Sequence, residues 1–212
     1  MIPFKHQTSR LKQRLQKKEL TVGSWLTIPH RSVVEVFAKS GFEWLVIDLE
    51  HSPIGIDQTA ELIAHIQGNG MQALVRVTKN EEVIIKRVLD AGADGIVVPM
   101  IKSKQEAEKA VSFTYYPPLG SRGVGLNRAQ HYGEGFESYK KWLNDNIVII
   151  AQIEHIDAIE NLDEILSVEG IDGTIIGPYD LSGSMGFPGD YNRPDVKDAL
   201  QSYITKVNKA NK

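Results

Sequence analysis

Two acidic residues, Glu154 and Asp180, are the first candidates for chemistry in this sequence. Each follows a short apolar run, and they lie 26 residues apart (180 − 154), the length of one strand–helix unit. If those runs are neighbouring parallel strands, both carboxylates reach the same edge of the sheet. Oxygen ligands suit Mg²⁺ or Mn²⁺, which keep open positions for water and substrate oxygens. The alternative is that both residues cap the following helices, and the spacing favours neither interpretation.

A histidine and an arginine supply candidate acid/base and anion-binding groups. His51 follows Asp48 and Glu50 at the end of an apolar run. A neighbouring carboxylate can fix its tautomer and raise its basicity, although a lone histidine is more often structural. Arg76 lies near the end of the run ALVRV, where an unpaired charge would be costly. It therefore either pairs with a structural carboxylate or faces the site and stabilises an enolate oxygen and a substrate carboxylate.

Three further residues lie beside the acidic pair. Gln152 precedes Glu154 by two positions and shares its strand face, so its amide either orients a bound water or is satisfied in the interior. Gly177 and Pro178 form a turn just before Asp180, which either offers backbone N–H groups to a substrate carboxylate or only reverses the chain.

The elements that must position these residues alternate regularly. Six near-continuous apolar runs are typical of strands buried on both faces: 22–28, 44–48, 72–77, 95–100, 147–153 and 171–176. Six amphipathic segments separate or follow them and predict helices: 31–39, 57–67, 81–90, 103–111, 155–166 and 194–208.

This βα repeat predicts a parallel sheet covered by helices. Glycines at 41, 70, 92 and 170 stand where helices should end in a left-handed residue. Functional groups at the carboxyl ends of several strands favour a barrel over an open sheet, which concentrates its site at one switch point. The long irregular stretch 115–135 is interpreted as a lid or mouth loop, and its glycines around Arg122 match no phosphate-loop spacing.

Composition narrows the class of protein. The 212 residues fit one buried core without a linker, so we expect a single domain over 1–212. A net charge of −3 offers no electrostatic footprint for nucleic acid or an anionic membrane. The absence of cysteine excludes disulfides, thiolate zinc sites and a cysteine nucleophile. The charged N-terminal segment lacks a long apolar run, so we expect a cytoplasmic protein.

Several linked segments carry a resemblance to a known family: GSWLTIP, DLEHSP, ALVRV, VVPMI, YYPPLGSRGVGLNRAQHYG, AQIEH and GPYDLSGSMG. In register from about residue 20 onward, the sequence resembles the HpcH/HpaI aldolase family, which is grouped with citrate lyase β-type proteins. The resemblance implies a (β/α)8 barrel of the TIM type. It also implies a class II pyruvate aldolase, such as the 4-hydroxy-2-oxoheptanedioate, 2-keto-3-deoxy-rhamnonate and 5-keto-4-deoxy-glucarate aldolases.

The resemblance implies a divalent metal, Mg²⁺ or Mn²⁺ with Co²⁺ as a further option, that binds the pyruvate moiety. Glu154 and Asp180 would be its ligands, Gln152 would contact a metal water or the substrate, and Arg76 would touch the keto oxygen. The metal and the arginine would withdraw charge from the carbonyl so that an enolate persists. The expected partners are pyruvate and an aldehyde, or a 4-hydroxy-2-oxo acid, in a homo-oligomer that the family resemblance makes a trimer or hexamer.

His51 would be the acid/base group that moves the proton of the aldol hydroxyl. Asp48, and Asp90 of this subunit or of a neighbouring one, would support it. The same enolate would make oxaloacetate decarboxylation a side activity.

The sequence departs from the family at its C-terminal end. Family members continue with two more strand–helix units, whereas about six are present here. An unclosed barrel leaves strand edges unpaired, so we expect the 212-residue chain alone to be unstable and poorly active.

Two other functions stay open on sequence grounds. A Schiff-base (class I) aldolase needs a desolvated lysine, and only Lys79 and Lys102 lie near strand ends, both among polar neighbours. A non-catalytic homologue would keep oxo-acid binding or only a scaffold. The aldehyde partner cannot be read from the sequence.

Overall fold

The computed structural model describes residues 10–210, which form one parallel sheet with helices between its strands. The six strands are hydrogen-bonded in chain order and each neighbouring pair is parallel. They are β1 (Gly23–Leu26), β2 (Trp44–Asp48), β3 (Gln72–Arg76), β4 (Gly95–Val98), β5 (Val148–Ile153) and β6 (Gly173–Ile176). All six predicted strands are confirmed, most of them with shorter bounds.

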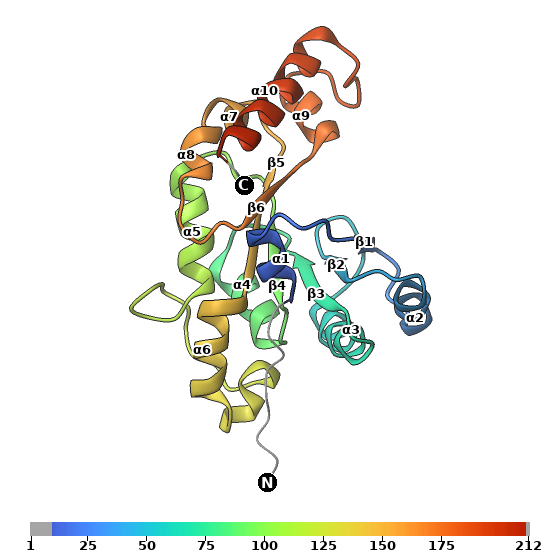
Figure 1. Ribbon diagram of the computed structural model, residues 1–212, viewed down its shortest axis with the longest axis vertical. Helices are drawn as coiled ribbons and strands as arrows, with labels where there is room; N and C mark the ends of the chain where they lie inside the picture. The colour runs from blue at the N-terminus through green and yellow to red at the C-terminus, as the bar shows by residue number, and fades with distance from the viewer. Residues whose placement is uncertain (1–9, 211–212) are drawn as a thin grey trace.

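Apart from α1, which precedes the first strand, the helices follow the strands and cover the outer face of the sheet (Figure 1). They are α1 (Arg10–Gln16), α2 (Arg31–Lys39), α3 (Ile56–Gly68), α4 (Glu82–Asp90), α5 (Lys104–Thr114), α6 (Phe136–Asn146), α7 (Ile156–Glu160), α8 (Leu162–Leu166), α9 (Pro178–Ser184) and α10 (Pro194–Ala210), with a 3₁₀ segment η1 (Arg128–Gly133). The predicted helix 155–166 divides at Asn161, where α7 ends and α8 begins. Helices α1, α6 and α9 were not predicted.

The four glycines expected at helix ends adopt the left-handed conformation. Their φ angles are 84° at Gly41, 81° at Gly70, 97° at Gly92 and 96° at Gly170. Each lets the chain leave a helix and enter the next strand without a steric penalty from a Cβ atom.

Alternation along the strands creates two apolar layers. Val46, Leu74, Val97 and Val148 belong to an inner cluster, against which Trp25 packs. Their neighbours along each strand belong to a larger cluster between the sheet and the helices. Because strand side chains alternate with period two, the inner face continues toward the carboxyl ends of the strands as the positions of the predicted polar residues.

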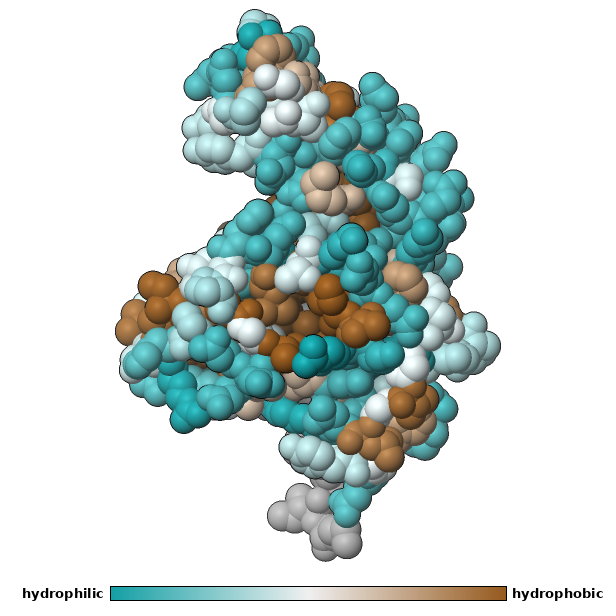
Figure 2. Space-filling model, turned by 180° about the vertical axis from the view of Figure 1, so that it is seen from behind, coloured by the Kyte–Doolittle hydropathy of each residue, from teal (hydrophilic) through white to brown (hydrophobic). Residues whose placement is uncertain are grey.

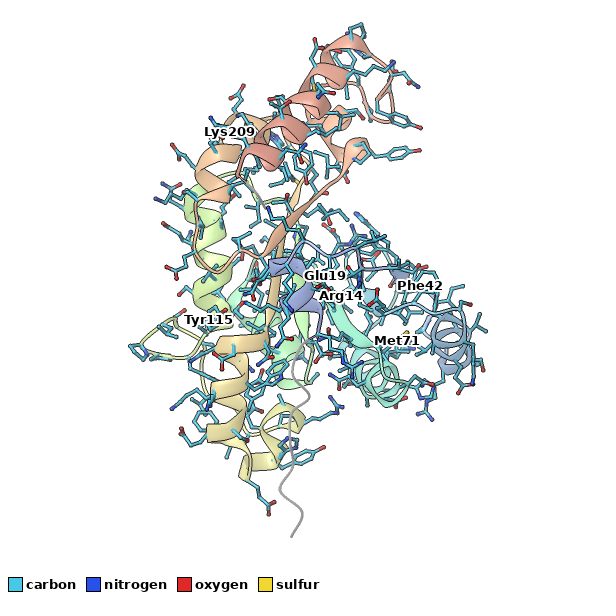
Figure 3. All side chains as sticks on the ribbon, in the orientation of Figure 1. Arg14, Glu19, Phe42, Met71, Tyr115 and Lys209 are labelled. Atoms are coloured by element: carbon cyan, nitrogen blue, oxygen red, sulfur yellow. The ribbon has the colours of Figure 1, made fainter. Side chains whose placement is uncertain are left out.

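Helix α1 closes the amino end of the inner face. Lys12 donates to the carbonyl of Ile147 at 2.7 Å and forms a 3.0 Å ion pair with Asp172, so it joins the starts of β5 and β6. In Figure 3, Arg14 of α1 lies at the centre of the molecule, with Phe42 and Met71, which lead into β2 and β3, beside it. The first described helix is thus a plug under the sheet.

The stretch 115–135 lies at the amino end of the strands, so its interpretation as a mouth loop is wrong. Arg128 donates to the carbonyl of Ala91 at 3.1 Å and to Gln67 Oε1 at 2.7 Å, both at the carboxyl ends of helices. Figure 3 shows Tyr115 at the end of α5, close to α6. Helices run back from the carboxyl to the amino edge of a parallel sheet, so an αβ connection, however long, returns there.

The sheet curls but its two outer strands stay apart within the described residues. β1 pairs only with β2, and β6 only with β5. Figure 1 shows the lobe of α9 and α10 set apart from the body that carries β1 and α2, and the space-filling view of Figure 2 shows a hollow between them with hydrophobic residues beside it. The fold is therefore a TIM-barrel-like α/β half-barrel. No helix among residues 10–210 has the length and hydrophobicity needed to cross a membrane.

Candidate active site

The site begins with an arginine–carboxylate pair at the ends of β2 and β3. Asp48 and Arg76 are register partners, both on the inner face. Arg76 Nε and Nη2 donate to the two oxygens of Asp48 at 2.8 and 2.7 Å. This bidentate pair supplies the partner that a buried arginine requires, and it fixes the plane of the guanidinium.

Asp48 also organises the turn that follows β2. Its Oδ1 accepts the backbone N–H groups of Glu50 at 3.0 Å and His51 at 3.2 Å. Burial alone would raise the pKa of Asp48, but the hydrogen bonds from Arg76 and these N–H groups outweigh it, so its pKa is lowered. Asp48 is thus a fixed anion whose oxygens are fully engaged, and it supports His51 through the backbone.

Trp25 of β1 contacts the Arg76 guanidinium. The Arg76 guanidinium carbon lies 4.6 Å from the centroid of the Trp25 ring, a cation–π contact. The guanidinium is therefore held by a carboxylate at its edge and by an aromatic ring on its face. Sequence reasoning missed Trp25, and the only signal for it was its inner-face position on the first predicted strand.

Glu50 lies between Arg76 and His51. Its Oε2 is 3.3 Å from Arg76 Nη1 and 3.8 Å from His51 Nε2. That oxygen is buried and receives no hydrogen bond, since the 3.3 Å ion pair lacks hydrogen-bond geometry. Burial raises the pKa of Glu50, Arg76 opposes the rise, and nearby Glu154 adds to it. Glu50 stands in the acidic cluster of the sequence, but no role was assigned to it there.

Glu154 lies just past the end of β5 and is 2% exposed. Its Oε1 accepts the backbone N–H of Met100 at 2.8 Å, and its Oε2 accepts the amide N–H of Gln152. Met100 reaches this position with a left-handed φ of 56°. The Gln152 Oε1 is buried and has no hydrogen-bond partner. The Glu154 carboxylate is thus held in place, and Gln152 Oε1 beside it is an acceptor without a donor.

The turn before α9 packs directly against Glu154. A Cβ atom added to Gly177 would lie 2.8 Å from Glu154 Oε2 and 2.9 Å from its Cβ, so only glycine fits. Pro178 occupies the first turn of α9, where its missing N–H costs no hydrogen bond. Asp180 lies in the same turn, with an exposed side chain.

Glu154 joins the two halves of the site. Its negative charge raises the pKa of Glu50, in the same direction as the larger effect of burial, and it raises the pKa of Arg76, against the larger effect of burial. The structure therefore brings together most of the predicted residues: Asp48, His51, Arg76, Gln152, Glu154 and Gly177.

The donor set fits a hard divalent cation. Within residues 10–210, no group of three or more histidine, aspartate or glutamate side chains is gathered as a metal site. Mg²⁺ and Mn²⁺ are commonly bound through one or two carboxylates, with water and substrate oxygens completing the shell. Glu154, the unpartnered amide oxygen of Gln152 and the acidic turn at Asp180 supply oxygen groups of that kind.

Asp90 is a predicted site residue that lies far from the site within this chain. It ends α4 at the amino end of the half-barrel, where Arg122 Nη2 donates to it at 2.6 Å and Gln130 Nε2 at 3.0 Å. Within the chain it therefore cannot support His51, and its role from a neighbouring subunit stays a prediction.

Comparison with known proteins identifies the relatives of this chain. Residues 21–212 match the family described as HpcH/HpaI aldolase/citrate lyase. A 2-keto-3-deoxy-L-rhamnonate aldolase of Escherichia coli O17:K52:H18 is 39% identical over 207 residues, covering 97% of this chain and 77% of that protein.

Solved structures of related proteins support the same family. A HpcH/HpaI aldolase/citrate lyase family protein from Burkholderia cenocepacia J2315 is similar with a TM-score of 0.91 and 33% identity, covering 96% of this chain and 82% of that one. The citrate synthase SbnG has a TM-score of 0.84 and 33% identity over 95% and 79% of the two chains. The chain thus belongs to the HpcH/HpaI aldolase/citrate lyase family and is a lyase.

Proposed function

We propose that this protein is a divalent-metal-dependent aldolase that cleaves or forms the carbon–carbon bond between pyruvate and an aldehyde. Its substrates would be 4-hydroxy-2-oxo acids, with 2-keto-3-deoxy sugar acids first because of the rhamnonate aldolase relative, and 4-hydroxy-2-oxoheptanedioate next. The observation that carries the proposal is that a fixed guanidinium and a held carboxylate, Arg76 and Glu154, lie near enough for their charges to interact, beside buried acceptors without partners.

Arg76 suits the stabilisation of an enolate. Asp48 occupies Nε and Nη2, which leaves Nη1 directed to the side where Glu50 and Glu154 lie. A donor that is already oriented needs no rearrangement when negative charge develops on a keto oxygen. The Gly177 N–H donates to the Ile153 carbonyl, and Pro178 has no N–H. The backbone N–H groups that follow Pro178 in the first turn of α9, including that of Asp180, would therefore receive the substrate carboxylate.

His51 suits proton transfer. Its ring is 62% exposed at the end of β2, so a substrate hydroxyl can reach it. During cleavage it would take the proton of the C4 hydroxyl, and during synthesis it would return that proton to the new alkoxide.

Glu154 and Asp180 would hold the cation, with Gln152 contacting a water or the substrate beside it. The bound cation would polarise the keto group as a Lewis acid. The family supports a divalent metal in general, and the choice among Mg²⁺, Mn²⁺ and Co²⁺ is part of the proposal. A homo-oligomer, a single domain and a cytoplasmic location belong to the proposal as well.

A class I mechanism is disfavoured by the surroundings of Lys79. Its side chain is 72% exposed and forms a 2.8 Å ion pair with Glu81, which raises its pKa. A Schiff-base lysine needs the opposite, a lowered pKa in a desolvated pocket.

Three measurements test the proposal against both alternatives. Pyruvate release is measured by a coupled assay across a panel of 4-hydroxy-2-oxo acids, before and after EDTA and after return of each metal. We expect metal-dependent release, best with a 2-keto-3-deoxy sugar acid. Full activity in EDTA together with borohydride trapping by pyruvate would establish the Schiff-base mechanism instead. No pyruvate release from any substrate, together with calorimetry that finds no metal-dependent heat of pyruvate binding, would establish a non-catalytic homologue.

A further inference from the structure

The surroundings of the His51 ring single out one carboxylate. Asp48 touches the backbone N–H of His51, but both of its oxygens are engaged by Arg76. Asp90 is held by Arg122 at the other end of the half-barrel. Among residues 10–210, the carboxylate that lies within ion-pair distance of the imidazole is Glu50, with 3.8 Å between its Oε2 and His51 Nε2.

The same oxygen of Glu50 also faces the arginine. Oε2 lies 3.3 Å from Arg76 Nη1, is buried and receives no hydrogen bond. A buried carboxylate oxygen without a donor is unfavourable, so a nearby N–H group gains by turning toward it. The exposed His51 ring has room to close the remaining distance, and hydrogen bonds of acid/base groups are often long before substrate binds.

The geometry points to Glu50 as a positioning residue that accepts the Nε2–H of His51 on the oxygen that also faces Arg76 Nη1. The proton of the neutral imidazole then stays on Nε2, and Nδ1 is left as the acceptor for a substrate hydroxyl. An imidazole whose tautomer is fixed presents one basic nitrogen, as carboxylates beside catalytic histidines ensure elsewhere.

The catalytic consequence rests on the proposed function. One carboxylate would hold both the group that moves the proton and the group that receives the enolate. Loss of Glu50 would then slow the chemical step more than it weakens substrate binding. A purely structural Glu50 would change the amount of folded protein and leave the tautomer of His51 as it is.

The experiment measures the tautomer and the kinetics separately. ¹⁵N spectra of substrate-free, histidine-labelled full chain at pH 9 give the ratio of Nε2–H to Nδ1–H forms, and His51→Asn assigns the signal. In Glu50→Ala we expect the Nδ1–H form of His51 to rise about threefold or more. In Glu50→Gln, which keeps the shape of the side chain, we expect kcat to fall about tenfold or more with KM within about twofold.

Glu35→Gln is the matched control, because Glu35 faces His65 at 3.2 Å between α2 and α3. It should change the signal of His65 only and leave kcat unchanged. An unchanged His51 tautomer in Glu50→Ala would overturn the inference, and so would a shifted tautomer with unchanged kcat. A shifted His51 tautomer in a protein that releases pyruvate from no substrate would support the Glu50–His51 pairing. It would contradict only the proposed function.

Discussion

The two ends of the half-barrel each contain an arginine paired with an aspartate. At the carboxyl end Arg76 binds Asp48 at 2.7 Å, and at the amino end Arg122 binds Asp90 at 2.6 Å. Arg122 is 1% exposed, and its guanidinium lies over the rings of Tyr116 and Tyr139 at 4.7 and 5.4 Å. Aromatic rings and Gln130 therefore enclose the amino-end pair, whereas the carboxyl-end pair lies beside unpartnered acceptors and an exposed imidazole.

The surroundings of the two pairs distinguish a structural ion pair from a functional one. The Arg122 pair fastens the long connection 115–135 to α4, and its neighbours occupy the surrounding space. Beside the Arg76 pair two buried acceptors, Glu50 Oε2 and Gln152 Oε1, receive no hydrogen bond from residues 10–210, whereas the unpartnered buried atom of the Arg122 pair is a donor, Arg122 Nε, in a guanidinium that lies over two aromatic rings. Two neighbouring buried acceptors without donors, beside an exposed imidazole, point to a ligand, because folding alone gains nothing from them.

Arg122→Ala tests whether the pair at the amino end is structural, and it should have the largest effect. Removing one partner leaves the Asp90 carboxylate in a largely buried setting, so we expect the free energy of unfolding to fall by about 3–5 kcal/mol. Urea unfolding measures this, with Arg31→Ala as the control, since the Arg31–Glu61 pair is exposed and worth below about 1 kcal/mol. Equal losses in the two variants would show that the amino-end pair is not structural.

Arg76→Lys tests the arginine–aspartate pair at the carboxyl end of the half-barrel. Lysine keeps the charge but loses the planar fork, so the bidentate contact with Asp48 and the oriented third donor are both lost. We expect kcat/KM for pyruvate release to fall about 10²–10³-fold, the range seen when one oriented donor to a developing oxyanion is removed. Arg87→Lys, on the exposed side of α4, should leave kcat/KM unchanged. A variant with nearly full activity would assign Arg76 a structural role.

Gly177→Ala sharpens the geometry around Glu154. The added Cβ would lie 2.8 Å from Glu154 Oε2 and would push the carboxylate away from its place. We expect kcat/KM to fall about tenfold and the metal concentration for half-maximal activity to rise, since small misplacements at a site are costly. Gly55→Ala meets no atom within 4 Å and serves as the control. A Gly177→Ala variant with unchanged kcat/KM would show that Glu154 takes no part in the reaction.

The smallest expected effect concerns Asp94, near Arg128 at the amino end. Burial raises its pKa from 3.8 to about 6, although Gln67, the Ala73 N–H and Arg128 oppose the rise. The folded state therefore holds the proton more tightly than the unfolded state, so this contribution to stability is present below about pH 4 and is lost as pH rises to about 6.

Thermal unfolding of wild type and Asp94→Asn from pH 4 to 7 measures the loss. The melting temperature of the wild type should drop relative to the variant between pH 4 and 6 and stay parallel above that. A constant difference across the range would mean that Asp94 ionises as freely in the folded protein as in the unfolded chain.

Most of the fold could be predicted because buried parallel strands leave near-continuous apolar runs. Helix α1 could not, since its buried residues Leu11 and Lys12 form no stripe and the helix is stabilised by strands far along the chain. Helix α6 was hidden behind the irregular stretch before it, although Tyr139, Trp142 and Leu143 are buried at helical spacing.

The candidate site could be predicted where residues follow strand periodicity. Asp48, Arg76 and Gln152 continue the inner face of their strands, so their convergence follows from the register. Glu50 lies past the end of β2, where the turn and not the period decides the direction of a side chain. The pairing of Asp90 with Arg122 joins residues 32 apart through a loop, and no local pattern indicates it.

The plug formed by α1 has a consequence for biosynthesis. Lys12 emerges early from the ribosome, yet its partners are the carbonyl of Ile147 and the carboxylate of Asp172, 135 and 160 residues later. Contacts that distant in sequence form slowly and only after the intervening chain has been ordered. The first helix of the described residues should therefore be among the last to dock, and the inner apolar face stays open at its base until β6 has been made.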